Sequence, residues 1–116
     1  MGQGSDTVVK AVRHVGPSVV VELAGEVDMY RTPQLLTTLS SITESQPPRV
    51  VVDLSEVQYM DSSGVGTLVH LFRQVKSYQG QLILVGPRPR VRSIFEITRL
   101  DRFFTICQTQ SEALAR

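Results

Sequence analysis

The sequence predicts an α/β fold: a single domain with a mixed β-sheet flanked by helices. First, its 116 residues, of which 41% are hydrophobic, can fill one ordinary core but not two. Second, two β-branched runs near the start are separated by a turn dipeptide, which is typical of a hairpin. Third, helical and strand patterns alternate in the rest of the chain, which favours a sheet covered by helices.

The opening of the sheet is predicted as an antiparallel hairpin. The runs VVKAVRHV (8–15) and SVVVELAG (18–25) are rich in β-branched residues and flank Gly16-Pro17. A helix is expected next, because Thr32 offers a capping hydroxyl before a proline suited to the first helical turn. That helix should end near Ser45. Its apolar residues follow at helical spacing: Leu35, Leu36, Leu39 and Ile42.

Residues 49–86 are predicted to form a β-α-β unit with parallel strands. RVVVDLS (49–55) and QLILVG (81–86) are short continuous apolar runs, typical of strands covered on both faces. The segment between them carries a helical stripe that Gly80 should end. The stripe consists of Val65, Leu68, Val69, Phe72 and Val75.

The C-terminal part should contain a third helix, a short strand and a helical tail. The helical pattern follows Pro87 and Pro89, and its apolar positions are Val91, Ile94, Phe95 and Ile97. The strand is expected at 103–107 and the tail at 111–116. Residues 1–6 are polar and are expected to be a flexible N-terminus, so that 7–116 would be the folded domain.

Composition and charge exclude several classes of function. A formal net charge of +1 gives no overall attraction to nucleic acid or to anionic membranes. The apolar runs are strand-sized, far below the roughly 20 residues that span a bilayer, and no secretory signal is visible at the start. The single cysteine, Cys107, cannot form an internal disulfide and is expected to fill the core. Together these features predict a cytoplasmic protein without membrane or direct nucleic-acid contacts.

Neither hydrolase nor phosphoacceptor-aspartate chemistry is supported. Ser62 and Ser63 occupy a strand-to-helix turn, but neither has glycines two residues before and after it, and no histidine adjoins them in the pattern. Asp53 lies at the end of the predicted strand without the further carboxylates of a magnesium site, and we expect it to cap the following turn. Nucleotide-binding glycine motifs and metal-ligand clusters are also missing, so no catalysis, cofactor or metal is expected.

Arginines are concentrated on and after the third predicted helix. The expected role of this group is a solvated face, with an acidic protein partner as the lesser alternative and nucleic acid as a distant third. Its members are Arg88, Arg90, Arg92, Arg99 and Arg102. The interspersed aromatics Phe95, Phe103 and Phe104 fit the periodicity of the core.

The segment MDSSGVG (60–66) begins the central helix and suits two roles. A helix N-terminus presents free N–H groups and partial positive charge, so it tolerates a phosphate on Ser62. Gly64 and Gly66 lack side chains, which would allow another protein's backbone to approach closely. The alternative is a plain helix cap with flexible glycines.

Three segments resemble the STAS domain, in particular the single-domain anti-sigma factor antagonists of bacteria. They are AGEVDMYRTPQL, RVVVDLSEVQYMDSSGVGTLVHLFRQVKSYQGQLILVG and VRSIFEITRLDRFF, and together they cover nearly the whole chain. The resemblance implies a mixed sheet flanked by helices, no intrinsic catalysis, and phosphorylation of the first serine of DSSG, which is Ser62. Around it, the resemblance implies a partner-binding surface made of Glu26, Asp28, Asp61, Ser63, Gly64 and Gly66.

The same resemblance implies the partners. An anti-sigma factor serine kinase with a histidine-kinase-like ATPase fold would bind the unphosphorylated protein and release its sigma factor. Phosphorylation would prevent this binding, and a phosphatase would restore it. STAS domains also serve as subunits of lipid or anion transport complexes and of stress-signalling scaffolds, and in that alternative Ser62 is only a helix cap. The sequence leaves open whether Thr67 is a second phosphorylation site.

Overall fold

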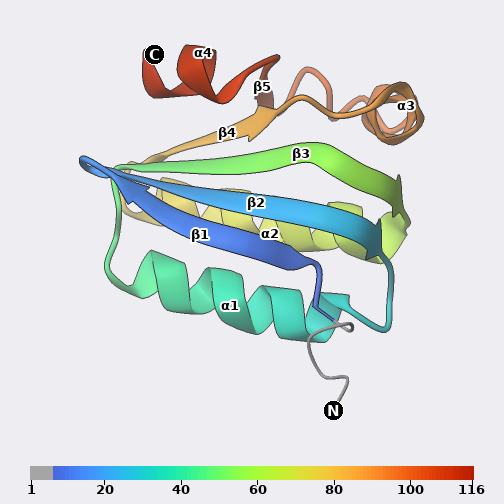
Figure 1. Ribbon diagram of the computed structural model, residues 1–116, viewed down its shortest axis with the longest axis horizontal. Coiled ribbons are helices and arrows are strands. Elements are labelled where there is room, and N and C mark those ends of the chain that lie inside the picture. Colours follow the sequence, from blue (N-terminus) through green and yellow to red (C-terminus); the bar gives the residue numbers. More distant parts are fainter. Residues whose placement is uncertain (1–6) are drawn as a thin grey trace.

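One mixed sheet and four helices make up residues 7–116, which are the part of the chain that the computed structural model describes (Figure 1). The strands are β1 (Val9–Val15), β2 (Ser18–Val27), β3 (Arg49–Met60), β4 (Gln81–Val85) and β5 (Thr105–Cys107). The helices are α1 (Thr32–Glu44), α2 (Ser62–Ser77), α3 (Pro89–Ile97) and α4 (Gln110–Leu114). The predicted flexible segment, residues 1–6, lies outside the described residues.

The sheet has the order β1-β2-β3-β4-β5. β1 pairs antiparallel with β2, whereas the pairs β2–β3, β3–β4 and β4–β5 are parallel. The predicted hairpin and the predicted parallel β-α-β unit are therefore both confirmed. The turn of the hairpin depends on Gly16, whose φ of 58° lies in the left-handed region that glycine adopts without strain.

Helices cover both faces of the sheet, and alternate residues of each strand serve the two faces (Figure 1). In β2, Val19 and Val21 point into the larger core, to which α1, α2 and α3 contribute. Val20 points to the opposite face, in a smaller core with Ala113 of α4. Cys107 belongs to this smaller core and is buried, as its expected role requires. No helix of the described chain is both long and apolar enough to cross a membrane.

β3 is longer than predicted, because it continues from Ser55 to Met60. The exposed residues in this extension interrupt the apolar run in the sequence, yet Val57 and Met60 are fully or almost fully buried and the strand keeps pairing with β2 as far as Val27. Asp53 consequently lies inside the strand and does not end it. Its carboxylate accepts hydrogen bonds from the Ser55 N–H and the Gln110 side chain.

Two other local predictions were wrong. Thr32 does not cap α1: the cap position is Arg31, without a side-chain bond, and Thr32 is buried as the first helical residue. Phe103 was expected in the core and in the last strand, but it precedes β5 and is 43% exposed. Its ring lies against Phe72, with centroids 4.2 Å apart. Ile97 is likewise exposed at the end of α3.

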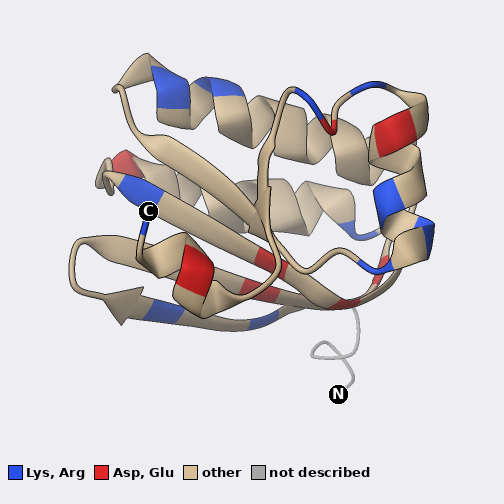
Figure 2. Ribbon diagram, turned by 90° about the horizontal axis from the view of Figure 1, so that it is seen from above, with Lys and Arg blue, Asp and Glu red and all other residues tan. Residues whose placement is uncertain are grey.

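The concentrated arginines lie on the surface, as the sequence predicts. All five members of the group are exposed, and basic positions on α3 are visible in Figure 2. Arg92 forms an exposed ion pair with Glu96, one turn along the helix. Because both side chains are exposed to water, this pair should contribute little to stability. Arg88 also donates a hydrogen bond to the Ser55 carbonyl at 2.9 Å.

Candidate functional site: the turn before α2

The turn between β3 and α2 is held by the carboxylate of Asp61. Its Oδ1 atom accepts hydrogen bonds from the backbone N–H groups of Ser63 (2.9 Å) and Gly64 (3.2 Å). The Ser63 hydroxyl also donates to it, at 2.5 Å. These bonds satisfy donors of the first helical turn that have no partner inside the helix. Asp61 is therefore the cap of α2, and Ser62 occupies the first helical position.

The same residue joins this turn to the loop between β2 and α1. Oδ2 of Asp61 accepts a hydrogen bond from the Met29 N–H (3.2 Å), and the Asp61 N–H donates to the carbonyl of Val27 (3.2 Å). The Thr32 hydroxyl lies 3.5 Å from that of Ser63. Two loops that are about 30 residues apart in the sequence thus form one continuous surface.

These hydrogen bonds lower the pKa of Asp61 below its ordinary value. The bond from the Ser63 hydroxyl is the largest cause, burial opposes it, and the N–H groups of Gly64, Ser63 and Met29 add to the lowering. A carboxylate whose pKa is lower in the folded than in the unfolded chain stabilises the fold above the unfolded value, about 3.9. This contribution is lost as the pH falls through the lower, folded pKa.

Asp61→Ala is expected to lower the free energy of unfolding by about 0.5–2 kcal/mol near neutral pH, because the cap is lost. Urea denaturation at pH 7 and near pH 3 measures the effect. The difference from wild type should shrink at the lower pH, because the stabilisation by the charge declines once the pH falls below the unfolded pKa and towards the lower, folded pKa. Asp61→Asn keeps a capping oxygen without the charge, so its free energy of unfolding at pH 7 should lie between those of wild type and Asp61→Ala. An undiminished difference at low pH would contradict the assignment of the charge to this cap.

The two serines of the turn differ in what their hydroxyls do. Ser63 is half-buried, and its hydroxyl is engaged by Asp61. Ser62 is exposed, and its hydroxyl forms no hydrogen bond within the described part of the chain. Thr67 is buried and donates to the Ser63 carbonyl at 2.9 Å. Of these three residues, Ser62 is thus the most exposed and the one whose hydroxyl forms no hydrogen bond within residues 7–116.

The two glycines of the turn also differ. Gly64 is buried, and a Cβ built there would lie 2.6 Å from Met60 Cγ and 2.9 Å from Val27 Cγ1. The expectation that Gly64 lets a partner's backbone approach is wrong, since this glycine serves the internal packing of α2 on the sheet. Gly66 is exposed, and a Cβ there would meet no atom within 4 Å. Of the two glycines of this turn, Gly66 is thus the one that leaves an exposed surface without a side chain.

Glu26 and Asp28 lie at the same end of the sheet but in different environments. Gly25, with a φ of 87°, sits at an irregularity of the β2–β3 register, and Glu26 after it is exposed opposite Tyr59. Asp28 accepts hydrogen bonds from the N–H groups of Tyr30 and Arg31 and forms an ion pair with the Arg31 side chain. Its side chain is only 16% exposed. The Asp28 carboxylate thus holds the loop that carries Met29.

Sequence reasoning missed three exposed apolar side chains beside this turn. Met29 and Tyr30 are 63% and 83% exposed in the loop that Asp61 and Asp28 hold, and Tyr59 is 43% exposed two residues before Asp61. We call these three residues the apolar rim. Large apolar and aromatic side chains at the surface mark interaction sites in many proteins. A signal was available, because Met29 and Tyr30 are apolar residues within a predicted loop.

Among residues 7–116, no hydrogen bond joins a histidine to either serine, and no group of three or more His, Cys, Asp and Glu could hold a metal ion. The arrangement offers an exposed hydroxyl at a helix N-terminus, a capping carboxylate and an apolar rim. It can be modified and bound by another protein.

Comparison with known proteins gives the family. The sequence model of the STAS domain matches residues 8–113, so the chain belongs to the STAS domain family. The anti-sigma-B factor antagonist of Listeria monocytogenes is 34% identical over 90 residues, which cover 78% of this chain and 79% of that protein. The family resemblance seen in the sequence is thereby confirmed.

Solved structures agree with this family. A crystal structure of an anti-sigma factor antagonist from Mycobacterium paratuberculosis superposes with a TM-score of 0.86 at 28% identity, covering 95% of this chain and 93% of that one. The Bacillus protein SpoIIAA in its phosphorylated form gives a TM-score of 0.74 at 27% identity, covering 91% and 96%. Its unphosphorylated form gives 0.81 at 28% identity, covering 91% and 93%. The predicted mixed sheet flanked by helices is the fold of these antagonists, which are regulatory proteins.

Proposed function

We propose that this protein is a phosphorylation-controlled anti-sigma factor antagonist that acts in the cytoplasm. The unphosphorylated form binds an anti-sigma factor serine kinase with a histidine-kinase-like ATPase fold and thereby frees the sigma factor. Phosphorylation of Ser62 blocks this binding, and a phosphatase reverses the modification. Relatives named as anti-sigma factor antagonists, one of them solved in both phosphorylation states, support the proposal.

The observation that carries the proposal is the difference between the two adjacent serines. The Ser63 hydroxyl is committed to the Asp61 carboxylate, whereas the Ser62 hydroxyl is exposed and unengaged within residues 7–116. Ser62 is also the first residue of a 16-residue helix, where an added anion is favourable by about 0.3–1 kcal/mol. A kinase can thus modify Ser62 while the cap and the fold remain intact.

The partner surface that we propose combines exposed and supporting residues. Glu26, Ser62 and Gly66 contact the partner together with the apolar rim. Asp28, Asp61, Ser63 and Gly64 support this surface from within, through the hydrogen bonds and packing described above. Tyrosine and methionine side chains supply large contact area to such a surface, so the apolar rim should provide much of the affinity.

The alternative of a transport subunit or a signalling scaffold assumed that Ser62 only caps the helix. That structural role belongs to Asp61, whose carboxylate bonds to the N–H groups of the first turn. Without a capping role for its hydroxyl, a serine at this position is better explained by modification. We therefore favour the antagonist function.

Incubation of the protein with its anti-sigma factor kinase and ATP should add one phosphate, which peptide mass spectrometry should locate on Ser62. Ser62→Ala should not be phosphorylated. Ser63→Ala is the matched control, because it removes the neighbouring hydroxyl and leaves Ser62 exposed, and it should still accept phosphate. Continued phosphorylation of Ser62→Ala would refute the assignment to this residue.

A further inference from the structure

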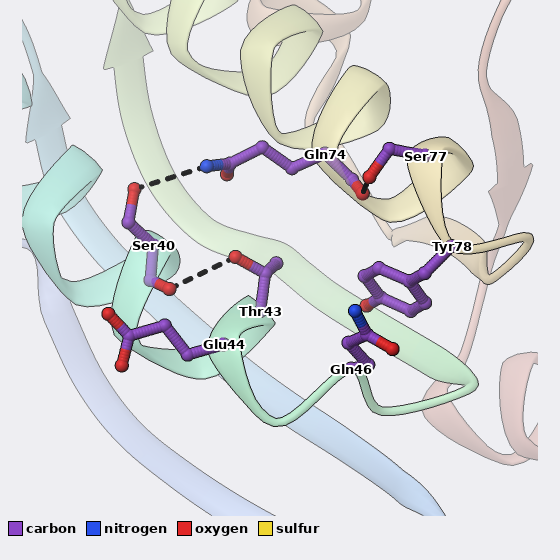
Figure 3. Close-up of a pocket in the computed structure, with 7 residues that line it drawn as sticks. All are labelled: Ser40, Thr43, Glu44, Gln46, Gln74, Ser77 and Tyr78. Atoms are coloured by element: carbon purple, nitrogen blue, oxygen red, sulfur yellow. Dashed lines mark hydrogen bonds between the residues drawn. The ribbon is translucent and has the colours of Figure 1, made fainter.

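A crevice of about 300 Å³ lies between the C-terminal ends of α1 and α2 (Figure 3). We call it the α1/α2 crevice. α1 and α2 run side by side in the same direction below the sheet, so that their C-terminal ends lie together (Figure 1). The residues that line the crevice come from these ends and the segments that follow them: Ser40, Thr43, Glu44, Gln46, Gln74, Ser77 and Tyr78.

Three of the four hydroxyl groups that line the crevice donate their protons to backbone carbonyls, whereas the Ser40 hydroxyl accepts a hydrogen bond from Gln74. Thr43 donates to the Ser40 carbonyl (3.0 Å), and Ser77 donates to the Gln74 carbonyl (2.6 Å). The Tyr78 hydroxyl donates to the carbonyl of Pro47 at 2.9 Å. A hydroxyl that donates to the protein still has oxygen lone pairs to offer. These three side chains therefore present acceptors to a ligand.

Gln74 adds an acceptor that the protein itself does not use. Its Nε2 reaches the Ser40 hydroxyl at 3.4 Å, whereas its Oε1 is buried and has no hydrogen-bond partner in the described part of the chain (Figure 3). Leaving a buried polar atom without a partner is costly, and native proteins contain few such atoms. A ligand with a hydrogen-bond donor would relieve this cost.

The electrostatics of the crevice favour positive charge. The two helix C-termini that meet here each carry a partial negative charge of roughly half an elementary charge. Glu44 adds a full carboxylate, and it takes part in none of the ion pairs formed within residues 7–116. The last turn of α1 contains no basic residue that would neutralise this charge. The last turn of α2 contains Lys76, but its ammonium lies over the Phe72 ring, 5.8 Å from the ring centre, and Lys76 is not among the residues that line the crevice.

We infer that the α1/α2 crevice binds a small organic cation through a primary ammonium group. An ammonium has three donors and no acceptor, which matches a crevice that offers acceptors and negative charge. Its donors are received by the neighbouring hydroxyl oxygens and by Gln74 Oε1, which a rotation of the half-buried Gln74 side chain brings into the crevice, and Glu44 supplies the charge. The volume is at the lower end of ordinary ligand sites and suits a molecule of a few heavy atoms.

This site is separate from the turn before α2. Gln74 is twelve residues along α2 from Ser62, which corresponds to roughly 18 Å at 1.5 Å per helical residue. Binding of a cation in the crevice does not depend on the proposed antagonist function, and either proposal can fail without the other.

The test is an NMR titration of ¹⁵N-labelled protein with putrescine, a diamine, at constant ionic strength. We expect saturable shifts at the side-chain amide of Gln74 and at backbone amides of residues 43–46 and 77–79. Butane-1,4-diol, which has the same length without the charge, should cause no such shifts. Shifts that never saturate, or that the diol or added sodium chloride reproduces, would overturn the proposal.

Two variants and one control assign the binding to these groups. Glu44→Gln conserves size at an exposed position and should weaken putrescine binding about five- to tenfold, while Gln74→Leu removes the buried acceptor and should weaken it by a similar factor. Glu96→Gln on α3 removes an exposed carboxylate elsewhere and should bind like wild type. Unchanged affinity in both Glu44→Gln and Gln74→Leu would refute the site, and so would equal weakening in Glu96→Gln.

Discussion

Ser62→Asp is expected to weaken binding of the partner kinase by about 10²-fold, and phosphorylation of Ser62 by about 10²- to 10⁴-fold. Either change places negative charge beside Asp61 in a surface that loses its water on binding. Spoiling a buried charged contact costs about 3–5 kcal/mol, which corresponds to this range. Aspartate carries one charge and phosphoserine about 1.5 to 2, so the variant should lie at the lower end. Isothermal titration calorimetry with the purified kinase measures the loss.

The matched control for this charge is Ser62→Ala, which should keep affinity within a few-fold of wild type, because the Ser62 hydroxyl has no partner to lose within residues 7–116. Both variants should also melt within a few degrees of wild type, since Asp61 caps the helix in each. Equal binding of Ser62→Asp and Ser62→Ala would contradict control by charge at this position.

Tyr30→Ala tests the apolar rim. This variant should bind the kinase about tenfold more weakly without unfolding.

Gly64→Ala is expected to destabilise the protein by about 1–2 kcal/mol. Its new methyl group would collide with Met60 and Val27, and the Val27 carbonyl oxygen, 3.1 Å from the built Cβ, belongs to the backbone of β2 and cannot rotate away. Overpacking of this kind costs about 1–3 kcal/mol, and the higher helix propensity of alanine offsets part of it. Thermal unfolding should show a melting temperature lowered by about 5–10 °C.

Gly66→Ala is the matched control, because it makes the same chemical change two residues further along α2. No atom lies within 4 Å of its built Cβ, so alanine should stabilise the helix by about 0.5–1 kcal/mol. Because Gly66 belongs to the proposed partner surface, this variant should also bind the kinase more weakly than wild type, although it is the more stable protein. A destabilised Gly66→Ala, or a Gly64→Ala as stable as wild type, would contradict the packing described for this turn.

Much of the fold could be predicted from local patterns. The β-branched runs of β1, β2 and β4 and the helical spacing of apolar residues in α2 depend on neighbours within a few positions, and these predictions were correct. The last residues of β3 escaped prediction, because their strand conformation is maintained by pairing with β2 and not by a local apolar run. Phe103 was misplaced for a similar reason, since its packing partner Phe72 is distant in the sequence.

The sequence by itself determined the class of fold and the family, and it indicated the segment that we propose as the site, because DSSG at a strand-to-helix boundary is a local feature. Only the tertiary structure decided what each residue of that segment does. Asp61 is the cap and bonds to Met29, more than 30 residues earlier, and Gly64 fits against Val27, which leaves Ser62 and Gly66 exposed. The physical reason is that burial and hydrogen bonding depend on which distant segments meet. The crevice between the ends of α1 and α2 arises in the same way, from two helices whose sequences show no sign of it.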